Sequence, residues 1–307
     1  MTCVVHLLPF QLGSLEFPPY TSSRRNFLMA FRLALMLPAC VLICCSLASG
    51  QDDPTQADLA KPVYMQIQYI QVPDGGDELY LQVENVWTKI HEARRDLGLI
   101  TAWATCRVER SRGSDADYNY VVVHLCDSWE DLENPIPWER IQEMVSFSEE
   151  EDSILEQTGE SRDLLRSEIW KFDSAAIPER FGKPGFDKTL TVGFMKSKRP
   201  RVHRQLEREF YSKLWAQAAR DGYRWNWSLW GCRFPSGSQR PHDLMTVHTY
   251  PEGKADYQLP EDWWPEAARK AFPDDSAEDL RSRFGRAGSL RDMVAVENWT
   301  IVAAVAE

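Results

Sequence analysis

The chain has 307 residues, and its 35 basic and 46 acidic side chains give a net charge of −11 at neutral pH. Such an acidic chain lacks the basic surface that nucleic acid or an anionic membrane requires, so neither is expected as a partner. Four of the seven cysteines lie in the first 50 residues, and we expect the other three (Cys106, Cys126 and Cys232) to be buried free thiols rather than a disulfide framework.

The first 50 residues have the pattern of an export signal. Ser23-Arg24-Arg25-Asn26-Phe27-Leu28 matches the twin-arginine motif, and an apolar stretch follows at 33–47. Ala48-Ser49-Gly50 then supplies the small residues that a signal peptidase requires. The apolar stretch is shorter than the roughly 20 residues that span a bilayer. We therefore expect cleavage after Gly50, a periplasmic or secreted protein, and no stable membrane insertion afterwards. The alternatives are a general secretory signal beginning at Met29 and a retained anchor.

The rest of the chain contains two similar halves. Four short segments recur in the same order at an offset near 125 residues. A period this long indicates two copies of a small domain rather than a solenoid. The matching pairs are Trp87-Thr88-Lys89-Ile90 with Tyr211-Ser212-Lys213-Leu214, Cys106-Arg107 with Cys232-Arg233, Val122-Val123-His124 with Thr246-Val247-His248, and Glu168-Ile169-Trp170 with Glu297-Asn298-Trp299.

The first half, residues 63–176, follows a polar linker at 51–62. Alternating β-branched and aromatic residues predict strands, and apolar residues at helical spacing predict helices. In chain order the expected elements are a strand at 63–72, a helix at 79–97, strands at 100–108 and 118–126, a helical region at 138–158 and a strand at 164–172.

The second half, residues 189–307, repeats this order. A linker at 177–188, rich in proline and glycine, separates the halves. The expected elements are a strand at 190–195, a helix at 202–219, strands at 224–234 and 243–250, helical material at 263–286 and a strand at 293–305.

This order of strand, helix, strand, strand, helix, strand is typical of the ferredoxin-like unit, so the predicted fold class is α+β. Two such units can cover each other's open sheet faces. Over residues 63–307 the sequence thus resembles the dimeric α/β-barrel superfamily, which includes monooxygenases, muconolactone isomerases and haem-degrading enzymes. The resemblance rests on element order and duplication, and it implies an intrachain barrel and a monomeric protein.

Alternation along the strands divides their residues between two faces. We expect the more apolar sets of the third strands to face the helices, which turns His124 and His248 toward the space between the sheets. In each fourth strand a glutamate and a tryptophan share a face. The predicted lining of this space is Gln66, Gln68, Tyr120, His124, Glu168, Trp170, His248, Glu297 and Trp299.

Three interpretations of this polar lining remain open. It can be a buried network in which the polar groups satisfy one another. It can be a ligand pocket with aromatic walls and a few polar groups. It can also be a metal site of two histidines and two glutamates, although the sequence contains no short ligand pair such as HxH or HExxH.

The leading hypothesis is an exported, soluble barrel that binds a small, largely apolar ligand, in its catalytic form as a monooxygenase- or isomerase-like enzyme. His124 and His248 are then the expected proton acceptors, because histidine titrates near neutrality, and Glu168 and Glu297 orient them. The expected ligand contacts are Gln66, Gln68, Tyr120, Trp170 and Trp299, with the cofactor unknown. The alternative is a non-catalytic protein with a filled barrel that binds another protein.

Overall fold

The computed structural model describes residues 63–112, 117–133, 136–180, 189–237, 240–250, 259–260 and 262–306. The chain divides into two units, Met1–Gln51 and Asp52–Glu307. The predicted export signal, the linker at 51–62 and most of the linker at 177–188 lie outside the described residues, and those assignments stay predictions.

The first half has the predicted element order, with additional short helices before its last strand. In chain order it contains β1 (Tyr64–Gln71), α1 (Asp77–Asp96), β2 (Ala102–Arg112), β3 (Tyr120–Cys126), α2 (Trp129–Glu133), α3 (Trp138–Met144), α4 (Glu149–Glu156), α5 (Thr158–Ser161) and β4 (Asp163–Ala175). A capping box at Ser148 and Glu151 starts α4, and Gly98 at φ 70° follows the end of α1.

The second half repeats the arrangement after a short 3₁₀ turn, η1 (Pro178–Arg180). It contains β5 (Thr189–Ser197), α6 (Pro200–Leu206), the π-helical turn η2 (Glu207–Tyr211), α7 (Ser212–Arg220), β6 (Asn226–Phe234), β7 (Leu244–Thr249), α8 (Trp263–Ala271), α9 (Ala277–Leu290) and β8 (Arg291–Val305). The predicted helix at 202–219 is therefore interrupted by one π turn, and the predicted helical region at 263–286 is two helices.

The eight strands form one closed antiparallel barrel in the order β1-β3-β2-β8-β5-β7-β6-β4. Within each half the strands have the ferredoxin-like order, and the two half-sheets join edge to edge where β2 pairs with β8 and β4 pairs with β6. Closure leaves no unpaired sheet edge. The predicted α+β class and the intrachain barrel are confirmed.

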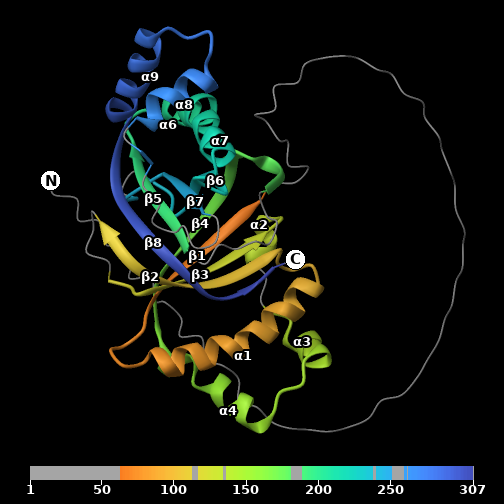
Figure 1. The fold of residues 1–307 in the computed structure, drawn as a ribbon. Helices are drawn as coiled ribbons and strands as arrows, with labels where there is room; N and C mark the ends of the chain where they lie inside the picture. Colours follow the sequence, from red (N-terminus) through yellow and green to blue (C-terminus); the bar gives the residue numbers. More distant parts are fainter. Residues whose placement is uncertain are drawn as a thin grey trace, which may run out of the picture. The chain divides into compact units, whose positions relative to one another are not determined.

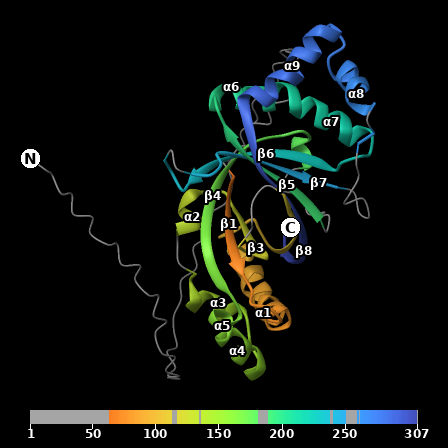
Figure 2. The same ribbon diagram turned by 90° about the vertical axis from the view of Figure 1, so that its left-hand side faces the viewer.

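The helices cover the outer surface of the barrel on two opposite sides. In Figures 1 and 2, α1, α3 and α4 lie below the barrel, whereas α6, α7, α8 and α9 lie above it. Each half-sheet therefore has an inner face toward the barrel interior and an outer face toward its own helices. Among the described residues no helix has the length and apolar character needed to cross a membrane.

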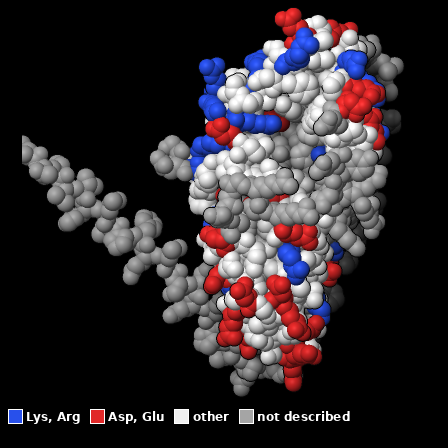
Figure 3. Space-filling model, turned by 60° about the vertical axis from the view of Figure 1, so that its left-hand side comes forward, with Lys and Arg blue, Asp and Glu red and all other residues white. Residues whose placement is uncertain are grey.

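The two helix layers differ in charge. Helix α4 begins with the four acidic residues at 149–152. Figure 3 shows Asp and Glu side chains gathered over the first-half helices at the bottom of the view, whereas most Lys and Arg side chains lie over the second half at the top. On this face the surface over the first-half helices is therefore the more negative one.

Candidate functional site

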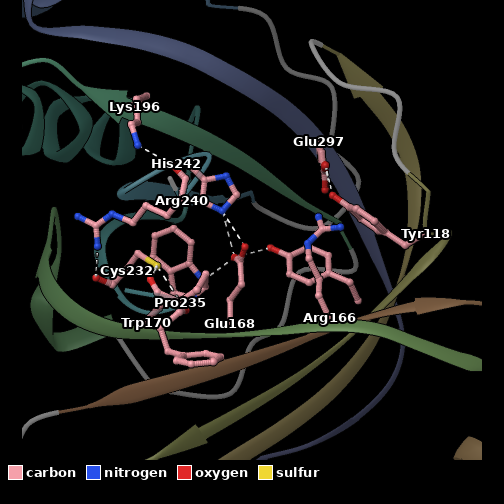
Figure 4. A network of polar contacts seen from close by, with 12 residues as sticks. Tyr118, Arg166, Glu168, Trp170, Lys196, Cys232, Pro235, Arg240, His242 and Glu297 are labelled. Atoms are coloured by element: carbon pink, nitrogen blue, oxygen red, sulfur yellow. Dashed lines mark hydrogen bonds and ion pairs between the residues drawn. The ribbon is translucent and has the colours of Figure 1, made fainter. Parts of the chain in front are cut away.

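The barrel interior contains four of the predicted site residues, and it is filled with side chains. Trp170 and Trp299 are 0% and 1% exposed and belong to one buried cluster with Ile67, Phe194 and residues of the other strands. Glu168 and Glu297 are buried beside them, 2% and 1% exposed. Figure 4 shows Glu168 and Trp170 at the centre of this network and Glu297 near Tyr118.

Glu168 accepts or shares hydrogen bonds with three side chains. The Tyr69 hydroxyl donates to its Oε2 at 2.8 Å, and Nε1–H of Trp170 donates to the same oxygen at 3.1 Å. Nε2 of His242 lies 2.9 Å from Oε1 and 3.1 Å from Oε2. This carboxylate is thus fully satisfied inside the barrel, as a buried charge requires.

Glu297 is held by two donors, and the bonds cross between the halves. Nε1–H of Trp299 donates to it at 2.8 Å, and the Tyr118 hydroxyl is the second donor. Tyr118 lies two residues before β3, and His242 lies two residues before β7. In each half the residue at this position therefore hydrogen-bonds to the glutamate of the other half, and these bonds connect the two half-sheets.

Two tyrosines and one arginine complete this network. The Tyr69 and Tyr118 rings lie 4.7 Å apart, and the Arg166 guanidinium lies 3.9 Å from the first ring and 4.8 Å from the second. Burial, followed by the negative charge of Glu168 for Tyr69 and of Glu297 for Tyr118, raises the pKa of both hydroxyls, which therefore stay protonated and donate. Of the three interpretations, the interior fits a buried polar network.

The predicted orientation of the other site residues is wrong. Tyr120 packs with Tyr80 of α1, and His124 contacts His91 of the same helix, so both lie on the outer face. His248 likewise contacts Trp215 of α7. Gln66 and Gln68 alternate with the inward Met65, Ile67 and Tyr69 and also lie on the outer face. The two histidines therefore do not meet Glu168 and Glu297, and the two-histidine, two-glutamate metal site is not assembled.

The error has a physical cause. The more apolar face of each strand was expected to pack against the helices. In a closed barrel, however, the interior is enclosed by strands on all sides, and it takes the apolar set that includes Val121 and Met245. The outer face meets amphipathic helices that also supply polar and aromatic partners, and it can hold a histidine.

The outer face of the first half is closed by rings. Trp103 and His124 are directly opposite each other on β2 and β3. The His91 ring stacks on Trp103 at 4.5 Å and lies 5.1 Å from His124. Burial, followed by the charges of Arg94 and Arg162, lowers the pKa of His124 to about 3, so its imidazole is neutral at pH 7. These three rings are packed between the sheet and helix α1, and His91 is buried there at 4% exposed.

The outer face of the second half contains a pocket of about 490 Å³. It lies between the sheet (β6, β7 and β8) and the helical layer (η2, α7, α8 and α9). We call it the outer pocket, and its lining is mainly aromatic. The lining residues are Glu207, Tyr211, Trp215, Trp227, Thr246, His248, Trp264, Pro265, Phe284, Arg291 and Met293.

Strand register shows which residues of the two halves correspond. Trp227 is opposite His248, as Trp103 is opposite His124. Gly193 is opposite Thr246, and Gln68 is opposite Val122 at the corresponding place. A Cβ atom at Gly193 would lie 3.0 Å from Oγ1 of Thr246 and 3.7 Å from Sδ of Met293, both of which line the outer pocket. A side chain at 193 would therefore crowd two residues of the pocket wall, whereas the first half has a glutamine at the corresponding place.

A π turn places two pocket residues. Glu207 and Tyr211 are the first and last residues of η2, and both line the outer pocket. The extra residue of a π turn changes the direction of the side chains before it relative to those after it, and such turns are frequent at functional sites. Helix α1, at the corresponding place in the first half, is regular over its whole length.

The polar groups of the outer pocket are few. Arg291 pairs with Glu207, and its guanidinium lies 5.2 Å from the Tyr211 ring. His248 is the one imidazole in the lining. Burial, followed by the positive charges of Arg224 and Arg291, lowers the pKa of His248 well below its usual value, so it is neutral at pH 7. The pocket thus offers aromatic surfaces, one ion pair and a neutral imidazole.

Sequence reasoning missed most of this pocket. Tyr211 was visible only as part of a repeat, and the other aromatic and charged residues of the lining gave no signal as a group. The available signal was a difference between the halves: glycine in place of Gln68 and tryptophan in place of His91.

Comparisons with known proteins identify no family for this chain. No family model matches it, and no curated protein matches. Solved structures with a similar chain course include a heme-binding protein from Thermus thermophilus (5% identity, TM-score 0.41, 79% of this chain and 92% of that one). Another is an anthrone oxidase-like protein (15% identity, TM-score 0.38, 80% of this chain and 93% of that one). A third is a mutant chlorite dismutase from Candidatus Nitrospira defluvii (9% identity, TM-score 0.39, 78% of this chain and 90% of that one). At these values the matches say nothing about the chemistry of this chain.

Proposed function

We propose that this protein binds a planar, largely apolar small molecule in the outer pocket. The observation that carries the proposal is a ligand-sized space of about 490 Å³ with a mostly aromatic and apolar lining, outside the cluster of buried side chains in the barrel interior. Small-molecule sites are concave and mostly apolar, with a few placed polar groups. The outer pocket has this composition, whereas the outer face of the first half is closed by His91, Trp103 and His124.

The rings of the pocket favour a flat aromatic ligand. Tyr211, Trp215, Trp227, Trp264 and Phe284 come from five different elements and line the space. Aromatic pairs in offset-stacked or edge-to-face contact stabilise a complex beyond the area they bury. Arg291 adds hydrogen-bond donors for an oxygen substituent of the ligand.

Binding of 2-naphthol to the purified mature protein tests this proposal by isothermal titration calorimetry. We expect saturable binding with one site per chain. Gly193→Gln should weaken it at least about tenfold, equal to 1.4 kcal/mol, because the new side chain displaces Thr246 and Met293 of the pocket wall. Gln68→Ala, the matched change in the first half, should leave affinity unchanged. Absence of saturable binding, or equal affinity in Gly193→Gln, contradicts the proposal.

Native mass spectrometry and an absorption spectrum of protein from its own host identify what the pocket carries. A bound aromatic molecule of matching mass supports the proposal. The alternative, a non-catalytic protein that binds a protein partner, shares the filled barrel but gives no role to the outer pocket.

Export is the second part of the proposal, and it rests on the sequence pattern at residues 23–50. We place the mature protein in the periplasm or outside the cell as a monomer, since one chain closes the barrel. Replacing Arg24 and Arg25 together by Lys should leave uncleaved precursor in the cytoplasm. Unchanged processing would instead favour a general secretory signal beginning at Met29.

A further inference from the structure

A chain of hydrogen bonds leads from the end of β5 to the outer pocket. Oγ of Ser197, a half-buried residue, lies 2.9 Å from Nδ1 of His203. Nε2 of His203 lies 3.1 Å from Oε1 of Glu207, which lines the pocket. His203 is 0% exposed and Glu207 is 1% exposed, so the link between them is shielded from water. An imidazole bonded at both nitrogens can pass a proton from one side to the other.

The bonds of Glu207 leave one of its oxygens free. His203 and Arg291 both bind Oε1. No described residue donates to Oε2, and this oxygen is the one available to a ligand. Arg291 makes its bonds to described residues through Nη1, to Glu207 and to Sδ of Met195, which leaves Nε and Nη2 as further donors. A carboxylate oxygen and guanidinium donors thus lie side by side in one apolar pocket.

The first half lacks this relay. Glu84 corresponds to Glu207, and Arg162 pairs with it as Arg291 does in the second half. At the place of His203, however, the first half has Tyr80, whose hydroxyl bonds Oγ1 of Thr105 at 2.8 Å and not Glu84. A purely structural ion pair therefore needs no histidine. The imidazole occurs in the half that has the pocket.

We propose that Glu207 exchanges protons with the ligand of the outer pocket and that His203 and Ser197 connect it to solvent. This inference rests on the proposed function and names the ligand class: planar aromatic molecules with an acidic C–H next to a carbonyl. The C–H proton moves to Oε2 of Glu207, and the bonding pair becomes the charge of an enolate oxygen that accepts from Arg291. Return of a proton to carbon regenerates the ketone, so no oxidant or reductant is consumed.

His203 acts through Glu207 and is a positioning residue. A half-turn of the Glu207 carboxyl group brings the protonated oxygen to Nε2 of His203, which takes the proton as Nδ1 passes one to the Ser197 hydroxyl. The other charged or titratable groups of the pocket are Arg291, Tyr211 and His248, and the neighbouring Arg208 is paired with Asp173. Of the described residues, His203 is the one that bonds both the Glu207 carboxylate and another exchangeable hydroxyl, that of Ser197.

Hydrogen–deuterium exchange of 2-tetralone in D₂O tests the inference, with the mature full chain and proton NMR as the readout. We expect exchange at the carbon beside the carbonyl to saturate with ketone concentration. Glu207→Gln should slow it about a hundredfold or more, the usual size of a general-base contribution. Glu84→Gln, the matched buried carboxylate without a pocket, should leave the rate unchanged.

The relay has its own readouts. Ser197→Ala should lower the exchange rate at saturating 2-tetralone without changing the half-saturating concentration. His203→Ala should be slow, and added imidazole should restore part of its rate, which a merely structural histidine would not show. Binding of 2-naphthol by each variant shows that its pocket is intact.

Two results separate the failures. If 2-naphthol binds but 2-tetralone exchanges no faster than in buffer, or exchanges as fast in Glu207→Gln, the inference is wrong and the binding function stands. If 2-naphthol does not bind to the unmodified protein, the proposed function itself fails.

Discussion

The two halves share one element order and one strand register but differ on their outer faces. In the first half, His91, Trp103 and His124 fill the space between sheet and helix. In the second half, Trp215 contacts His248, and an open pocket of about 490 Å³ remains beside them. A repeated fold thus keeps one copy as packed core and opens the other, with glycine at 193 and a π turn at Glu207–Tyr211 as the local changes.

The halves also differ inside the barrel. Tyr69 and Phe194 occupy corresponding positions on β1 and β5, opposite Val121 and Met245. Tyr69 donates to Glu168, whereas a phenylalanine at 194 has no hydroxyl to donate to Glu297. Among the described residues, Glu168 therefore has three side-chain partners and Glu297 has two. The comparison predicts unequal stability effects for two glutamates that the sequence makes look equivalent.

The largest expected effect is on barrel stability. Glu168→Ala leaves the Tyr69 hydroxyl, the Trp170 indole and His242 without their shared acceptor, and it should lower the free energy of unfolding by about 3–5 kcal/mol, as removal of one partner of a buried pair does. Glu297→Ala should cost about 1–3 kcal/mol, because fewer donors are left unsatisfied. Urea unfolding followed by tryptophan fluorescence measures both. Equal losses would mean that the extra donors of Glu168 contribute nothing.

A second prediction concerns acid sensitivity. Burial lowers the pKa of His91, His124 and His248 in the folded protein, for His124 to about 3, whereas the unfolded chain has values near 6.5. Between these values the unfolded state binds more protons, so stability is lost as the pH falls below about 6.5. By pH 5 His124, with its pKa of about 3, should cost about 2 kcal/mol, and His91 and His248 should act in the same direction.

The difference between variants isolates this effect from the carboxylates. Urea unfolding at pH 7 and pH 5 should show a smaller acid loss for His124→Gln than for the unmodified protein, by about 2 kcal/mol. His91 and His124 lie 5.1 Å apart and cannot easily be charged together. The loss of stability at acid pH that comes from these two first-half histidines should therefore exceed the loss that comes from His248 in the second half. An unchanged acid loss in His124→Gln would show that this imidazole is protonated or exposed in the folded protein.

The sequence predicted the architecture because periodicity and repetition are local signals. Element order and the α+β class follow from alternation, helical spacing and the 125-residue offset, and the inward direction of Glu168 and Trp170 was also predicted correctly. The inward direction of His124 and His248 was wrong, because alternation gives two faces but does not say which one a closed barrel encloses. The outer pocket depends on the absence of a side chain at Gly193 and on one π turn, and neither has a periodic signature.

The smallest predicted effect distinguishes the two histidines that the sequence treated as equivalent. His248 lines the outer pocket, so His248→Ala removes part of its wall and should weaken 2-naphthol binding about threefold to tenfold. His124 lies among packed rings away from the pocket, so His124→Ala should leave affinity unchanged and cost about 2 kcal/mol of stability by leaving a cavity. Calorimetric titration measures the affinity of both variants for 2-naphthol, and urea unfolding measures their free energies of unfolding. Weaker binding in His124→Ala, with His248→Ala unaffected, would reverse the assignment of core and pocket to the two halves.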